Sequence, residues 1–137
     1  RAFRSIRRVH SGWFYGLYRR EALVETWNVA QSFPYAWGGE FIGLLPLLAA
    51  GQVGGSNAAV YYKQETPLSA ARYRPKNLRD QFVFYCRFLQ KCLVILRVAG
   101  IPPSHKLALM PLMLLYTGRH GWKFRRLVVS ALGLKKY

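Results

Sequence analysis

Acidic residues and cysteines are scarce in this chain of 137 residues, which contains five Asp or Glu and two Cys. Cys86 and Cys92 are too few to build a disulfide framework, which excludes a small secreted cysteine-rich protein. The three histidines are scattered at His10, His105 and His120, and no spacing among these five residues fits a zinc site. The sequence therefore predicts no metal ligands of its own.

Long hydrophobic runs are also missing. The longest apolar stretches, 41–50 and 107–116, have ten residues each, whereas a membrane-spanning helix needs about 20. The basic N-terminal segment 1–10 is not followed by an apolar run, so no signal peptide is predicted.

Positive charge and apolar side chains are abundant. Lys and Arg total 21, the net charge is +16 at pH 7, and 52% of the residues are hydrophobic, which excludes a wholly disordered basic tail. Three explanations for the charge stay open: nucleic-acid binding, contact of the C-terminal segment with anionic lipid, and a solvated surface whose balancing acids lie elsewhere. No helix-turn-helix, RRM or zinc-finger pattern supports the first.

The hydrophobic pattern predicts both helices and strands. Asn77 with Asp80 three residues later is typical of a helix start, and Pro46 is expected to kink its helix or delay the start. The expected elements are helices over 19–29, 40–50, 77–99 and 107–116, a basic amphipathic helix over 118–137, a strand over 58–63, a short strand or loop over 10–18, and a loop over 32–39.

Glu40 differs from the other acids because it follows Trp37-Gly38-Gly39 and opens an apolar segment. A carboxylate at such a loop-to-helix junction can stabilise the helix N-terminus by about 0.3–1 kcal/mol. It can also act as a general base. The residues alone leave both interpretations open.

Residues 13–98 resemble the C-terminal half of the catalytic domain of family 2 glycosyltransferases. The segment GLYRREAL at 16–23, the acidic motif Gly38-Gly39-Glu40, Gly51 eleven residues later and the segment 60–63 follow the order and spacing of that family. The resemblance implies an α/β fold of the GT-A type. Residues 1–76 would form the acceptor side of the catalytic domain, and 77–137 a helical, basic, membrane-surface region.

The resemblance implies an inverting enzyme that transfers a sugar from a nucleotide-sugar donor to a hydroxyl of a glycan or lipid-linked acceptor. Glu40 would be the general base, although the family usually has Asp there. The acceptor would be bound by Tyr35, Trp37, Gly38, Gly39 and Arg19.

A divalent metal, Mn or Mg, is implied for the full-length enzyme, but the Asp-x-Asp motif that binds donor and metal in that family is missing. The only Asp is Asp80, so the chain is expected to be a fragment that is inactive alone. The expected location is the cytoplasm, with peripheral attachment at the inner face of the membrane. The alternative function is a non-catalytic basic module that contacts nucleic acid or an anionic membrane surface, nucleic acid being the less favoured partner.

Overall fold

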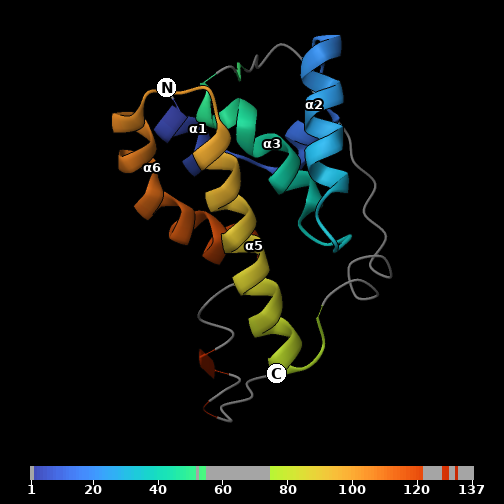
Figure 1. The fold of residues 1–137 in the computed structure, drawn as a ribbon. Helices are drawn as coiled ribbons and strands as arrows, with labels where there is room; N and C mark the ends of the chain where they lie inside the picture. Colours follow the sequence, from blue (N-terminus) through green and yellow to red (C-terminus); the bar gives the residue numbers. More distant parts are fainter. Residues whose placement is uncertain (1, 52, 55–74, 122–127, 130–131, 133–137) are drawn as a thin grey trace.

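A computed structural model describes residues 2–51, 53–54, 75–121, 128–129 and 132 of the chain (Figure 1). Its longer helices are α2 (Arg20–Gln31), α3 (Gly39–Ala49), α5 (Leu78–Val98) and α6 (Pro103–Tyr116). Three short elements accompany them: α1 (Ala2–Arg8), the 3₁₀ helix η1 (Ser11–Tyr15) and the π-helical turn η2 (Thr117–Gly121).

The α/β fold of the GT-A type that the sequence resemblance implied is wrong. The described residues contain helices and turns but no strand. Residues 10–18, expected as a short strand or loop, contain η1, whose Trp13 and Gly16 amides donate to carbonyls three residues earlier, at 3.0 and 3.1 Å. Since these backbone groups bond locally, this segment needs no partner strand. The strand expected over 58–63 lies outside the described residues.

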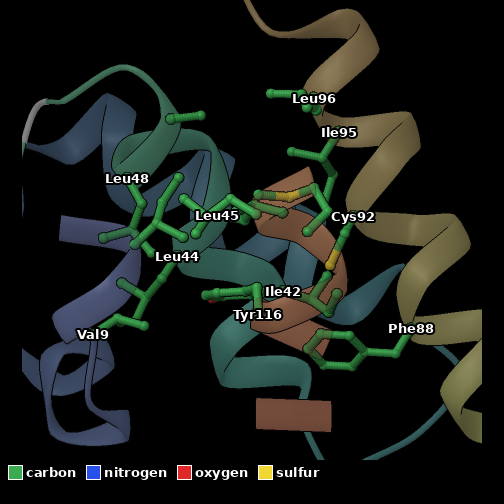
Figure 2. Packing of buried hydrophobic residues seen from close by; sticks show 14 of the residues in the cluster. Val9, Ile42, Leu44, Leu45, Leu48, Phe88, Cys92, Ile95, Leu96 and Tyr116 are labelled. Carbon is green, nitrogen blue, oxygen red and sulfur yellow. The ribbon is translucent and has the colours of Figure 1, made fainter. Parts of the chain in front are cut away.

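The apolar helix α3 lies at the centre of the fold. Its buried side chains, which include Ile42, Leu44, Leu45 and Leu48, point to all sides of the helix rather than to one face. A helix that is hydrophobic all round must be surrounded, and α3 contacts α1, α2, α5 and η1. Figure 2 shows Leu45 pointing toward Cys92 of α5, whereas Leu44 and Leu48 lie on the side of Val9.

The second wall of the core comes from the long helix α5. Its buried face includes Phe84, Phe88, Cys92 and Ile95, which join α3 and α6 in one hydrophobic cluster (Figure 2). The helix begins as predicted, since the Asn77 side chain accepts a hydrogen bond of 2.8 Å from the Asp80 amide.

The helices expected over 19–29, 40–50, 77–99 and 107–116 are confirmed, with small shifts at their ends. The expected delay at Pro46 does not occur, because α3 begins at Gly39 and Pro46 lies inside it. The helix α6 starts earlier than predicted, at Pro103, a residue type that suits the first turn of a helix.

Side chains from both predicted segments, 1–76 and 77–137, contribute to one core, while the separate roles given to the two segments stay a prediction. Of the helix expected over 118–137, only residues 118–121, 128–129 and 132 are described. No described helix is both long and apolar enough to cross a membrane.

Candidate functional site

Glu40 lies in the first turn of α3, directly after the loop 32–38. Its side chain is partly exposed, and its Oε1 accepts a hydrogen bond from the hydroxyl of Tyr15. Because η1 packs against α3, this hydrogen bond joins two segments that are 25 residues apart in the sequence. The carboxylate is therefore oriented by a neighbouring phenol as well as placed at the positive end of a helix.

The opposite side of this turn is also fixed. Phe41, the residue after Glu40, stacks on the ring of His120 with centroids 4.3 Å apart, and its carbonyl accepts a hydrogen bond of 2.7 Å from the Tyr116 hydroxyl. Burial raises the pKa of Tyr116 well above its usual value, so the phenol stays protonated and remains a donor. The start of α3 is thus attached both to η1 and to the end of α6.

The His120 ring is neutral at neutral pH. Burial, followed by the charges of Arg119 and His10, lowers the pKa of His120 to about 4. The ring lies between the aromatic rings of Phe41 and Tyr116, with centroid separations of 4.3 and 4.8 Å. Its role here is packing rather than proton exchange at neutral pH.

Gly38 has a backbone conformation that explains its identity. Its φ of 83° is in the left-handed region, and a Cβ at this position would lie 2.9 Å from Cε2 of Phe88 and 3.3 Å from Cζ of Phe84. Glycine therefore lets the loop pass closely over the aromatic face of α5. Close packing against α5 therefore requires glycine at position 38, independently of the acceptor-binding role predicted for it from the sequence.

Gly39 is buried at the contact between α2 and α3. A Cβ there would meet the Ala30 carbonyl oxygen at 3.6 Å, an ordinary van der Waals distance. A side chain at position 39 would therefore point toward α2.

Tyr35 and Trp37 both pack against the core while remaining partly exposed. The Tyr35 ring meets Phe84 edge to face, with centroids 5.0 Å apart, and lies 5.3 Å from Phe33. The structure thus gives these rings a core-covering position, and their contact with an acceptor sugar stays a prediction.

Arg19 lies away from the other predicted site residues. It is the N-cap of α2 and is exposed, whereas the loop 32–38 follows the C-terminal end of the same helix. A helix of 12 residues is about 18 Å long. The structure therefore places five of the predicted site residues in the loop 32–38 and the first turn of α3: Tyr35, Trp37, Gly38, Gly39 and Glu40. Arg19 lies at the other end of α2.

Tyr15 is the site residue that the sequence analysis missed. The segment 10–18 was expected as a short strand or loop, and nothing in it identifies Tyr15 as the donor to a carboxylate. The pairing depends on how η1 folds onto α3, which local patterns do not encode.

The described residues offer no set of ligands for the Mn or Mg that the resemblance implies, since no three His, Cys, Asp or Glu among them gather as a metal site would require. Comparison with protein families, curated proteins and solved structures finds no match for this chain.

Proposed function

We propose that this chain acts in glycosyl transfer and that Glu40 is the general base that deprotonates the acceptor hydroxyl. The observation that carries the proposal is the position of Glu40, a partly exposed carboxylate at a helix start that is oriented by Tyr15 and follows the loop bearing the partly exposed Tyr35 and Trp37. The proposal does not require a GT-A fold, since the same chemistry recurs on unrelated folds.

The reaction requires a base because a hydroxyl is a weak nucleophile until its proton is taken. The acceptor oxygen forms a bond to the anomeric carbon while the bond from that carbon to the nucleoside diphosphate breaks. The nucleotide leaves with the electron pair of that bond, and the acceptor proton passes to Glu40. Attack from the side opposite the leaving group inverts the configuration.

The hydrogen bond from Tyr15 supports this role for Glu40. It occupies Oε1 and restrains the side chain, while a carboxylate can accept further hydrogen bonds through its other oxygen. Aromatic faces such as those of Tyr35 and Trp37 are apolar surfaces on which a sugar ring can pack.

The test uses protein expressed from the complete open reading frame that encodes this chain. Release of nucleoside diphosphate is followed with UDP-glucose, UDP-N-acetylglucosamine and GDP-mannose, with and without Mn²⁺, and donor affinity is measured separately by calorimetry. We expect Glu40→Gln to lower turnover by about 10²–10⁴-fold and to leave donor affinity unchanged, because only the base is lost.

Glu25→Gln is the matched control, because Glu25 is an exposed glutamate on α2 whose replacement leaves the α3 turn intact. Tyr15→Phe is expected to lower turnover less than Glu40→Gln, since it removes only the group that orients the base. Undiminished turnover in Glu40→Gln, or no nucleotide release with any donor, would overturn the proposal.

A further inference from the structure

The helix α6 is apolar on two opposite faces. One face packs into the core through Leu109, Leu112, Met113 and Tyr116. The other face carries Leu107 and Leu115, each 70% exposed, together with Met110 and Leu114, which are about half exposed. Since a helix that is hydrophobic all round needs contacts all round, the second face lacks a partner within the part of the chain that the structure describes.

A hollow of about 660 Å³ adjoins this face, between α1, α5, α6 and η2. Its walls are mainly apolar and include Leu114 and Leu115, which also belong to the exposed face. Arg7 and Arg119 line the same hollow, and Nη1 of Arg119 donates a hydrogen bond of 2.6 Å to the Arg7 carbonyl. Both arginines are therefore close to one end of the apolar face, where the guanidinium of Arg7 also lies over the Phe3 ring, 5.7 Å from its centroid.

Negative charge is placed elsewhere in the described part of the chain. Its four acids lie on α2, α3 and the first turn of α5 (Glu21, Glu25, Glu40 and Asp80), whereas α1, α6 and η2 contain none. Figure 1 shows α2 and α6 on opposite sides of the molecule. The surface around α6 thus combines exposed apolar side chains with cations, in a chain of net charge +16.

We propose that the outer face of α6, formed by Leu107, Met110, Leu114 and Leu115, docks on a membrane that contains anionic lipids, with Arg7 and Arg119 contacting lipid phosphates. The helix lies in the plane of the interface, and its leucines enter the boundary between headgroups and acyl chains. With 14 residues it is too short to cross the bilayer. Guanidinium groups suit this contact because they bind phosphate oxygens in a bidentate geometry.

The charge distribution favours a lipid surface over other occupants. A second copy of a chain with charge +16 would be repelled. A nucleic acid would satisfy the two arginines, but its phosphate backbone has no apolar layer to receive four exposed hydrophobic side chains. An anionic bilayer offers both kinds of contact at once.

The experiment is co-sedimentation of the full chain with vesicles of phosphatidylcholine alone and of phosphatidylcholine with 30% phosphatidylglycerol, at 50 and 500 mM NaCl. We expect binding to the anionic vesicles that weakens with salt, because screening shortens the reach of the charges. Arg7→Gln and Arg119→Gln should each weaken binding about 5-fold at low salt, the effect of about 1 kcal/mol per cation.

The double variant Leu107→Ser/Leu115→Ser should weaken binding about 10-fold or more, since it removes apolar burial at the interface. Both side chains are largely exposed, so the far-ultraviolet circular dichroism spectrum and the melting temperature should stay those of the wild type. The matched controls are Leu23→Ser/Val24→Ser, an apolar pair on α2 that is about half exposed, and Arg79→Gln in the first turn of α5, and they should bind as the wild type does.

Three outcomes would overturn the proposal: equal binding to neutral vesicles, unchanged binding by the α6 variants, or an equal loss in the α2 control. Binding to a 20-base-pair RNA duplex in place of vesicles would also overturn it in favour of a nucleic-acid partner. Because vesicle binding is measured without any sugar donor, failure here leaves the role proposed for Glu40 unaffected, and the reverse also holds.

Discussion

Gly38 holds the turn that carries Glu40 close to α5. The loop passes over Phe84 and Phe88 at a distance that leaves no space for a side chain, and the backbone has a positive φ. Both facts identify glycine at this position as a requirement of folding. An effect of a Gly38 variant on activity must therefore be separated from its effect on stability.

Gly38→Ala is expected to destabilise the protein by about 2–5 kcal/mol, since the left-handed backbone and the contact with Phe88 both oppose a Cβ. The change in the midpoint of urea denaturation measures this loss. Gly100→Ala is the control, because a Cβ at that position meets no atom within 4 Å. Equal stability of the two variants would contradict the packing described around Gly38.

His120 links stability to pH. Between pH 6.5, its ordinary pKa, and the value of about 4 in the folded protein, the unfolded chain binds a proton that the folded protein does not. Stability contributed by the neutral ring is therefore fully present above pH 6.5 and is lost as the pH falls towards 4. Because His120 is only partly buried, screening limits this loss to about 1–2 kcal/mol.

His120→Phe keeps an aromatic ring against Phe41 and Tyr116 but cannot be protonated. We expect its melting temperature to fall less than that of the wild type between pH 7 and pH 4.5. The difference between the two proteins isolates the contribution of His120 from that of every other group in the chain. If the melting temperatures of the two proteins fell equally with pH, the ring would bind a proton as readily in the folded protein as in the unfolded chain, which would contradict the lowered pKa of His120.

Single residues show how far the sequence could predict the site. Glu40 was identified because an acid after two glycines and before an apolar run is visible locally. Tyr15 was not identified as its partner, nor His120 as the ring that stacks on Phe41, because these contacts join residues that are 25 or more positions apart. Such contacts depend on tertiary packing and leave no local pattern.

At the level of elements, the observed helix boundaries agree with the residue types that favour the start and the end of a helix. α5 begins after Asn77. The side-chain oxygen of Asn77 accepts a hydrogen bond of 2.8 Å from the backbone amide of Asp80, and its side-chain nitrogen donates one of 2.7 Å to the Asp80 carboxylate. The helix ends before Gly100 and two prolines. Helical period and capping residues are local, so they could be predicted from the sequence.

Asn77→Ala should lower the free energy of unfolding by about 1 kcal/mol, since it leaves a first-turn amide without its acceptor. Asn77→Ser should retain most of the stability, because serine caps a helix equally well and adds no second carboxylate beside that of Asp80. Gln90→Ala, an exposed substitution in the middle of the same helix, is the control and should change stability little. Urea denaturation of the three variants tests this, and a loss in Gln90→Ala as large as in Asn77→Ala would contradict the cap.

Two elements were predicted incorrectly for related reasons. The first ten residues were read as a basic lead-in, yet Ala2–Arg8 form α1 and bury Ile6. Residues 11–15 form a 3₁₀ helix where a strand or loop was expected. Both segments are too short to show a period, so their conformation is set by contact with α3.

For the whole molecule, the sequence predicted the helices but not their assembly into a helical core. The α/β expectation came from the resemblance, and the hydrophobic pattern added a strand over 58–63 and a short strand or loop over 10–18. The hydrophobic pattern of 41–50 already indicates why the helices assemble around α3. This stretch is apolar on every side, so α1, α2 and α5 pack around it. Which helices cover which side could not be read from local spacing.

The exposed face of α6 also has a consequence for how copies of this protein behave towards one another in concentrated solution. Mutual repulsion from a net charge of +16 keeps the leucines on neighbouring molecules apart at low ionic strength. Added salt weakens that repulsion and leaves the attraction between apolar faces intact. The chain should therefore stay dispersed in dilute buffer and become colloidally unstable in concentrated salt, the reverse of the familiar practice of adding salt to keep a basic protein in solution.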